Sequence, residues 1–172
     1  MRKFGALAIA AVIGLTGCGG GGVGVANDGG AKAAELGVGD TTDLGDLVSS
    51  MKVDLTLDSV DSEFQCPEPP YDAEPNQRYV RFNVTLAPKD GKKTGPLSSF
   101  EWVAVDKAGT ESKVDWRVAQ LCVPPKEQVP LGFTDDKPVK GSLIFPVPAG
   151  TTAVIGRVPW IDPQPSLTLK VS

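Results

Sequence analysis

The chain of 172 residues carries 17 basic and 21 acidic side chains, contains three cysteines and has no histidine. The absence of histidine excludes Ser-His-Asp and Cys-His catalytic arrangements, and it removes the most common general base and metal ligand of proteins. Hydrophobic residues make up 41% of the chain, as in ordinary globular proteins, which argues against global disorder.

The first 17 residues have the three parts of a secretory signal peptide. A basic head at residues 2 and 3 precedes an apolar run over residues 4–15, and small residues follow at 16 and 17. The apolar run is shorter than the ~20 residues that span a bilayer as a helix. The sequence "LTGC", which ends at Cys18, resembles the bacterial lipobox, whose cysteine receives a diacylglycerol and becomes the new N-terminus. We therefore expect lipidation at Cys18. The alternative is an ordinary signal peptide with a chance cysteine.

Cleavage before Cys18 would change the charge of the chain. It would remove two basic side chains and leave 15 against 21 acidic ones, a balance of −6 before the new N-terminus is counted. Such a chain is repelled by nucleic acid and by anionic headgroups. We expect no nucleic-acid partner, and a membrane contact through the covalent lipid anchor. The expected location is the bacterial cell membrane, facing the extracytoplasmic side.

Two further regions follow the signal peptide. Residues 18–46 are rich in Gly, Ala and Asp and hold no aromatic residue. Such a segment cannot bury enough apolar surface to offset its ordering entropy, so we expect a flexible linker with a mean span of about 30 Å. Residues 47–172 are expected to form one domain, because about 125 residues suffice for one core and not for two.

From residue 47 on, apolar and polar residues alternate with period two, which predicts strands that bury one face. The alternation is regular over residues 51–57 and 80–86, and Gly, Pro and Asp between the runs predict turns. The pattern predicts an all-β fold, an immunoglobulin-like antiparallel β-sandwich of about seven strands. The expected strands cover residues 51–60, 79–86, 100–105, 113–121, 139–147, 153–158 and 167–171.

The stretches "FEWVAVDKAGTESK" and "KPVKGSLIFPVPAGTT" resemble the C-terminal half of domain of unknown function 4352. This family is an immunoglobulin-like sandwich of exported proteins and lipoproteins of Gram-positive bacteria, and a secreted mycobacterial antigen has a similar fold. The resemblance covers residues 47–172. It implies a hairpin turn at Asp106 and Gly109, and a strand through Gly141, Phe145 and Val147 that ends at Pro148. Because the family has no assigned activity, it implies a non-enzymatic extracellular role.

Once Cys18 is assigned to lipid, Cys66 and Cys122 remain. In a chain exported to an oxidising compartment, a disulfide between them is the expected state. Two free buried thiols are the alternative.

The sequence offers no catalytic constellation. Ser-x-x-Lys at residues 49–52 begins a predicted strand and lacks the partner motifs of a serine hydrolase. Zinc and copper lack ligands, and the acids at 58–63 and at 135–136 leave calcium open, with solvated turn acids as the favoured interpretation. We expect no catalytic residue, no metal, no cofactor and no enzymatic activity. The core of a sandwich usually takes one or two tryptophans, which is the favoured interpretation of Trp102, Trp116 and Trp160, with a ligand platform as the alternative.

Prolines follow both of the paired cysteines, in "CPEPPYDAEP" and "CVPPKEQVP". A disulfide would hold the two loops at one end of the sandwich, and prolines would stiffen them. Stiff loops lose little entropy on contact and therefore suit a binding surface. The alternative is that the prolines protect the loops from proteolysis and the sheet edges from pairing with other chains. The candidate binding residues are Tyr71, Pro69, Pro70, Pro124 and Pro125.

These features predict a lipid-anchored extracellular domain that binds or scaffolds at the cell surface. A protein and an envelope polymer both stay open as its partner. The alternative is a structural envelope lipoprotein without a specific ligand, and an enzyme or metal carrier is a distant third.

Overall fold

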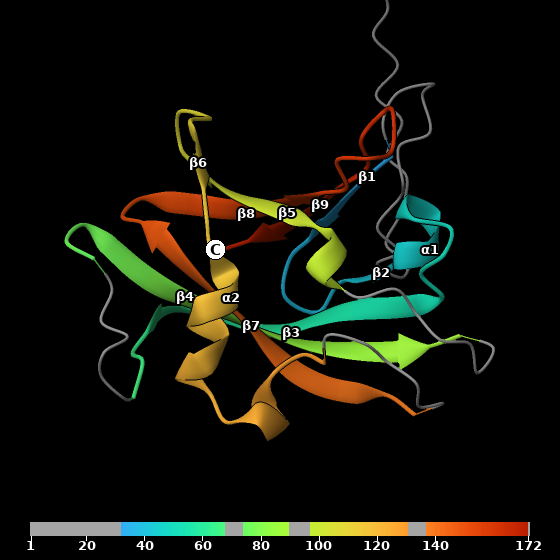
Figure 1. Ribbon diagram of the computed structural model, residues 1–172, viewed down its shortest axis with the longest axis horizontal. Helices are drawn as coiled ribbons and strands as arrows, with labels where there is room; N and C mark the ends of the chain where they lie inside the picture. Colours follow the sequence, from blue (N-terminus) through green and yellow to red (C-terminus); the bar gives the residue numbers. More distant parts are fainter. Residues whose placement is uncertain (1–31, 68–73, 90–96, 131–136, 172) are drawn as a thin grey trace, which may run out of the picture.

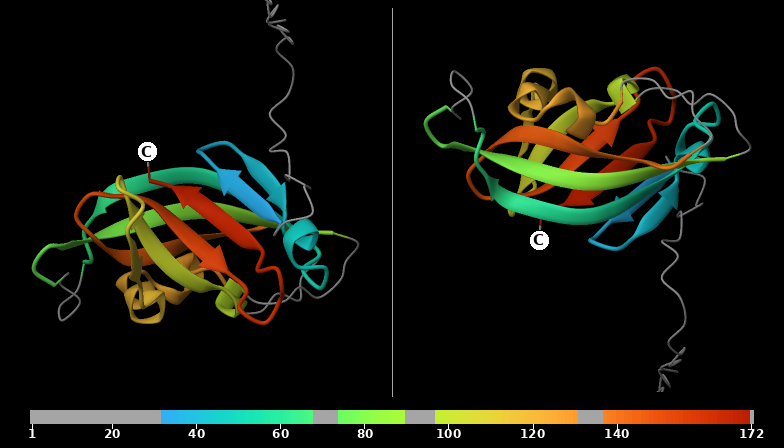
Figure 2. Two further views of the ribbon diagram at one scale, coloured as in Figure 1. Left: turned by 90° about the horizontal axis from the view of Figure 1, so that it is seen from above. Right: turned by 90° about the horizontal axis from the view of Figure 1, so that it is seen from below.

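Two β-sheets packed face to face make up the part of the chain that the computed structural model describes, residues 32–67, 74–89, 97–130 and 137–171 (Figures 1 and 2). The expected lipidation site Cys18 lies outside these residues, and so do Tyr71, Pro69 and Pro70. The possible calcium ligands at 135–136 also lie outside them.

The sandwich that the alternating pattern predicts is confirmed. One sheet has the strand order β1-β9-β8-β5-β6, and the other has the order β2-β3-β4-β7. The described residues hold more strands than the sequence indicates, because two strands precede residue 47. The strands are β1 (Ala33–Leu36), β2 (Thr41–Asp43), β3 (Val53–Phe64), β4 (Gln77–Pro88), β5 (Glu101–Asp106), β6 (Glu111–Lys113), β7 (Val139–Pro148), β8 (Thr151–Arg157) and β9 (Ser166–Lys170).

One hydrophobic core fills the space between the sheets. Every second residue of β4 from Val80 to Leu86 is buried, as its period predicts. The ring of Phe145 on β7 lies near three other aromatic rings, with centroid distances of 5.8 Å to Phe82, 5.0 Å to Trp102 and 6.3 Å to Trp116. These distances are typical of favourable aromatic pairs. Trp102 and Trp116 are thus core residues, as expected.

The domain begins earlier than the sequence indicates, and the expected linker is wrong from residue 33 on. Strand β1 joins the edge of the five-stranded sheet, where it runs parallel to β9 in an otherwise antiparallel sheet. Strand β2 pairs with β3, and helix α1 (Leu44–Leu47) follows it. Leu36, Leu44 and Leu47 are buried in the main core. Composition alone does not predict structure here, because the region consists mostly of small residues. A few buried leucines and the backbone pairing of β1 and β2 hold it in the fold.

Lys89, just after β4, bridges the end of β2, which caps α1, and β3. Its ammonium group lies 2.7 Å from a carboxylate oxygen of Asp43 and 2.8 Å from one of Asp54. Asp43 also caps α1 by accepting a hydrogen bond of 2.7 Å from the Gly45 N–H. Burial opposes the charge of Asp43, but the bonds from Lys89 and Gly45 outweigh it and leave its pKa below the ordinary value. The bonds to Asp43 and Asp54 raise the pKa of Lys89.

The turn that the family resemblance implies is confirmed between β5 and β6. The Asp106 carboxylate accepts hydrogen bonds from the backbone N–H groups of Ala108 and Thr110, and Gly109 adopts a φ of 82°. That positive φ is accessible to glycine at little cost. Strand β7 ends at Pro148, also as implied.

The strand expected over residues 113–121 is wrong. Strand β6 ends at Lys113, and the chain continues through helix α2 (Trp116–Ala119) and two 3₁₀ turns, η2 (Gln120–Cys122) and η3 (Pro125–Glu127). A third 3₁₀ turn, η1 (Leu97–Ser99), precedes β5. The Asp115 side chain caps α2 by accepting from the Arg117 N–H, a start signal typical of helices. Among the described residues, no helix has the length and apolarity needed to cross a membrane.

Candidate functional site

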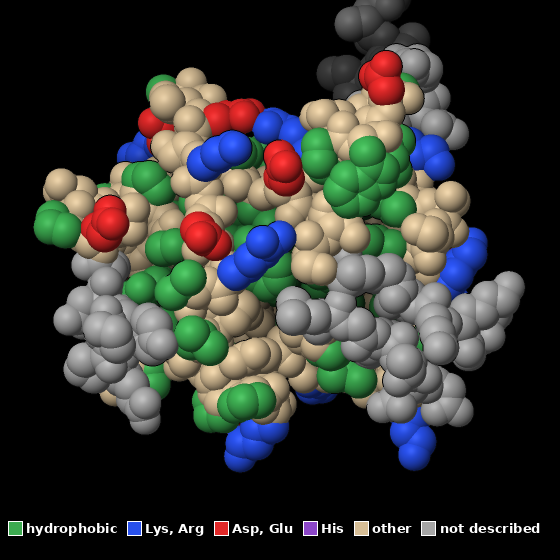
Figure 3. Space-filling view, in the orientation of Figure 1, with side chains coloured by type: hydrophobic (Ala, Val, Ile, Leu, Met, Phe, Trp, Pro, Cys, Tyr) green, Lys and Arg blue, Asp and Glu red, His purple; other side chains and the backbone are tan. Residues whose placement is uncertain are grey.

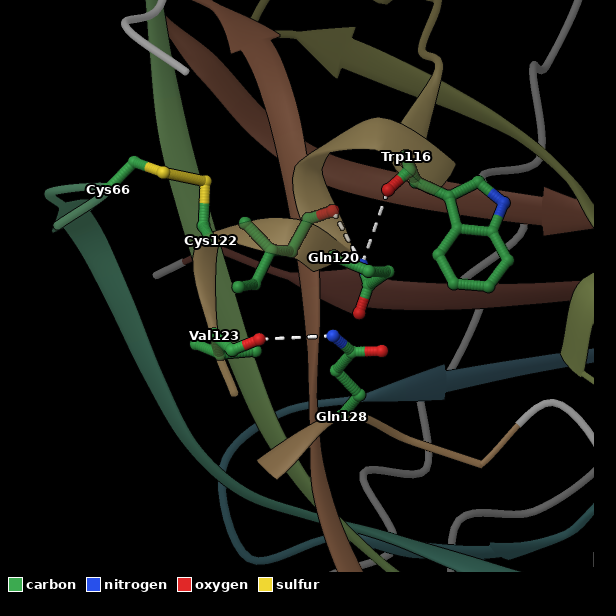
Figure 4. Close-up of a disulfide and its surroundings, with 7 residues drawn as sticks. Cys66, Trp116, Gln120, Cys122, Val123 and Gln128 are labelled. Atoms are coloured by element: carbon green, nitrogen blue, oxygen red, sulfur yellow. Dashed lines mark hydrogen bonds between the residues drawn. A yellow bond between two sulfur atoms is a disulfide. The ribbon is translucent and has the colours of Figure 1, made fainter. Parts of the chain in front are cut away.

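Residues 114–130 leave β6, at the edge of one sheet, and pass along β7, at the edge of the other (Figure 1). We call them the crossing segment. A disulfide between Cys66 and Cys122 ties it to the end of β3, with a Cα–Cα distance of 4.9 Å that is ordinary for such a bond (Figure 4). The expected pairing of these two cysteines is confirmed.

A second, smaller core lies under the crossing segment, on the outer face of the four-stranded sheet. Ala119, Cys122 and Val123 pack there against Ile144 of β7, which is fully buried. The residues on either side of Ile144 in β7 belong to the main core, so this strand is covered on both faces. Its unbroken apolar run "LIF" is the sequence signal of that double burial.

Two glutamine side chains stabilise the crossing segment through backbone carbonyls (Figure 4). The Gln120 amide donates to the Ile144 carbonyl at 3.0 Å and to the Trp116 carbonyl at 3.4 Å, which joins α2 to β7. The Gln128 amide donates to the Val123 carbonyl at 3.0 Å and closes the loop that contains η3. Buried amide groups need such partners, because leaving them unpaired costs about 1 to 3 kcal/mol each.

The crossing segment passes so close to β7 that position 141 requires glycine. The Val129 N–H donates to the Ser142 carbonyl at 3.3 Å, and Gln128 forms a parallel bridge with Ser142. A Cβ atom at Gly141 would lie 2.7 Å from the Val129 nitrogen and 2.8 Å from its Cα. These are backbone atoms that cannot rotate away. Gly141 therefore sets how closely the segment covers the edge of β7.

An apolar groove lies along the crossing segment. It consists of two hollows of about 420 and 380 Å³, which share Leu121 and Gln128. Leu121 is 57% exposed and Val118 is 55% exposed, although both are large apolar side chains. The first hollow is lined by Ser98, Trp116, Arg117, Gln120, Leu121, Gln128 and Val129, and the second by Pro67, Leu121, Cys122, Val123, Pro124, Pro125 and Gln128.

Among the described residues that line this groove, the charged one is basic, Arg117. No described lining residue is acidic. Arg117 lines the groove and Lys126 follows Pro125 in η3, and neither forms an ion pair with a described residue. In Figure 3 the acidic side chains of this face lie in the upper half, while hydrophobic side chains gather below, over α2 and the residues after it. The groove therefore suits an apolar group beside a negative charge.

The structure places some of the sequence-predicted binding residues in the groove. Pro124 and Pro125 line its second hollow together with Pro67, so the two cysteine-linked loops do meet there. Sequence reasoning missed Arg117 and Leu121, because it assigned them to a strand. The signal that could have found them is Asp115, a helix-capping residue directly before an amphipathic "WRVAQL".

The described acids of β3 make contacts within the sheet. Asp58 accepts from the Thr85 hydroxyl at 2.6 Å, and Glu63 pairs with Arg78. Within the described ranges, no group of three or more His, Cys, Asp or Glu residues is arranged to hold a metal ion.

Comparison with known proteins supports the fold. The chain is similar to the crystal structure of a secreted protein from Mycobacterium tuberculosis, MPT63, with a TM-score of 0.53 and 17% identity, over 80% of this chain and 95% of that one. It also matches the YjhA protein from Bacillus subtilis with a TM-score of 0.45 and 12% identity, over 78% of this chain and 98% of that one. No protein-family model and no curated protein sequence matches the chain. Membership of domain of unknown function 4352 stays a prediction.

The contact at Gly141 predicts the effect of one methyl group. Gly141→Ala should lower the free energy of unfolding by about 1 to 3 kcal/mol, because the crossing segment must move away from β7. Gly37→Ala is the matched control, since a Cβ there meets only Asp40 at 3.4 Å and should change stability by less than about 0.5 kcal/mol. Denaturant unfolding measures both variants. Equal stabilities for the two would show that the segment does not press on β7.

Proposed function

We infer that the protein is a lipid-anchored immunoglobulin-like domain on the extracytoplasmic side of a bacterial membrane, and that it binds another protein there without enzymatic activity. The observation that carries the binding role is the groove along the crossing segment. It combines apolar hollows, the exposed side chain of Leu121 and an Arg117 that pairs with no described acid, all on a backbone held by the disulfide. A preformed apolar site of this kind loses little conformational entropy when a partner binds.

The anchor rests on the sequence around Cys18, and other features of the chain agree with it. The Cys66–Cys122 disulfide is a feature of proteins that reside in oxidising compartments. The chain also shares its fold with a secreted protein. A diacylglycerol on the Cys18 thioether supplies two acyl chains, which is enough for stable membrane attachment.

The chemistry of the groove favours a protein partner over an envelope polymer. A saccharide needs several side chains free for hydrogen bonding, but the amide nitrogens of Gln120 and Gln128 already donate within the crossing segment. The hollows instead fit large apolar side chains, and Arg117 fits a carboxylate next to them. We propose that the partner presents an apolar side chain beside an Asp, a Glu or a C-terminal carboxylate. A structural envelope lipoprotein without a ligand is the second candidate.

The anchor is tested with Cys18→Ser. We expect this variant to lose its partition into the detergent phase and its signal after labelling of cells with a radioactive fatty acid, because the hydroxyl cannot form the thioether. The wild-type chain is the control in both measurements. Equal partition of the two proteins would contradict the anchor.

The groove is tested by photo-crosslinking on cells that display the native chain. A crosslinking residue at position 121 should give a discrete protein adduct, whereas one at Val38 should not, although Val38 is similarly exposed at 62%. Arg117→Gln should reduce the adduct at position 121, and Lys107→Gln should not. Once the partner is purified, Leu121→Ser should weaken its binding about fivefold or more.

The outcomes separate the two candidates. An adduct that forms equally at positions 121 and 38 would contradict the groove as the binding site. No adduct at any position would favour the structural lipoprotein.

A further inference from the structure

We propose that Trp160 contacts the membrane surface to which Cys18 is anchored, in the headgroup region, and thereby orients the domain with its disulfide-bearing end outward. This proposal goes beyond the binding role and rests on the lipid anchor of the proposed function. It starts from the one aromatic side chain that the described part of the chain leaves exposed.

Trp160 lies in the loop between β8 and β9 and is 65% exposed. Its neighbours fix the loop on the domain. Val158 is fully buried, Ile161 packs against the main core, and Pro165 is buried. The Ile161 N–H also donates to the Val158 carbonyl at 3.3 Å, which closes a turn around Trp160. The ring is thus held outward by a loop that is itself anchored.

The loop lies at the place where the chain from Cys18 reaches the domain. Ala33, the first residue of β1, is in register with Ser166, the first residue of β9. The Ser166 N–H donates to the carbonyl of Lys32, the first described residue, at 2.9 Å. Figure 1 shows the β8–β9 loop beside the start of β1. Trp160 therefore belongs to the end of the sandwich nearest the attachment point.

The early start of the domain also shortens the expected linker. Because β1 begins at residue 33, only residues 19–31 separate Cys18 from the described chain. From Cys18 to residue 32 there are 14 residue steps. A fully extended chain of that length reaches about 50 Å at most. The linker length thus keeps this end of the domain near the lipid.

Tryptophan is the side chain that this position favours. Its ring is apolar and its N–H is polar, so it partitions to the boundary between lipid headgroups and acyl chains. Anionic headgroups repel this net acidic chain, so electrostatic attraction does not hold the domain at the bilayer. An aromatic contact does not depend on that charge. The β5–β6 turn lies at the opposite end, since Asp106 pairs with Thr151 at the start of β8 and Trp160 follows the end of β8. The disulfide lies there too, because the end of β3 just before Cys66 pairs with the start of β4, which in turn pairs with Pro148 just before β8.

The test uses the full lipidated chain in phosphatidylcholine vesicles whose acyl chains carry bromine near the headgroup. Bromine quenches tryptophan emission at short range. We expect wild-type emission to fall relative to unbrominated vesicles, and the fall to disappear in Trp160→Phe, because Trp102 and Trp116 are only 3% and 5% exposed. The matched control is Lys107→Trp in the Trp160→Phe background, which places an exposed tryptophan at the opposite end. It should show no quenching.

Flotation of the same vesicles separates this proposal from the anchor. Wild-type and Trp160→Phe chains should both float, because the covalent lipid is sufficient for attachment. A floating wild-type chain without quenching, or equal quenching of the Lys107→Trp chain, would overturn the orientation and leave the anchor intact. A wild-type chain that does not float would overturn the anchor and this proposal with it. Quenching by soluble iodide but not by brominated lipid would point to a solvent-facing Trp160 and would also overturn it.

Discussion

The disulfide between Cys66 and Cys122 is the constraint on which the surface of this protein depends. It joins residues that are 56 positions apart, for which loop entropy alone gives a stabilisation of roughly 4 kcal/mol. Its structural effect is local, because it holds the crossing segment against the outer face of the four-stranded sheet. The small core around Ile144, the hydrogen bonds of Gln120 and the close approach at Gly141 all require the segment to lie there. The groove that we propose as a binding site is the outer surface of the same segment.

The crossing segment also covers one side of the sandwich, in addition to forming the groove. Trp116 enters the main core next to Phe145, while three residues further on Ala119 belongs to the smaller core. The crossing segment therefore contributes to both cores and covers the free edge of β7, where an unpaired strand would otherwise attract other chains. The exposed Leu121 and Val118 have no role in either core. The exposure of these two side chains is the reason why we propose a partner for this surface.

Sequence reasoning recovered what depends on local pattern and missed what depends on tertiary contact. The alternation in β3 and β4, the Asp106–Gly109 turn and the cysteine pairing all have local or compositional signals, and all were predicted correctly. Strand β1 has no such signal, because its order comes from backbone pairing with β9, far away in the chain. In residues 113–121 some apolar side chains pack in the main core, some in the smaller core, and some lie on the surface. Their spacing therefore resembles the alternation of a strand. The groove could not be predicted for the same reason, since Pro67, Leu121 and Gln128 meet only through the fold.

The central claim is that the disulfide holds the crossing segment in its binding-competent position. Amide hydrogen exchange of the full chain, compared with that of the Cys66→Ala/Cys122→Ala variant, tests it most directly. The amides to follow are those of Val123, Glu127 and Val129, which donate to the carbonyls of Gln120, Pro124 and Ser142. We predict that their exchange speeds up at least about tenfold, equivalent to about 1.4 kcal/mol, while the buried centre of β4 keeps its protection. Unchanged protection of these three amides in a folded variant would contradict the account.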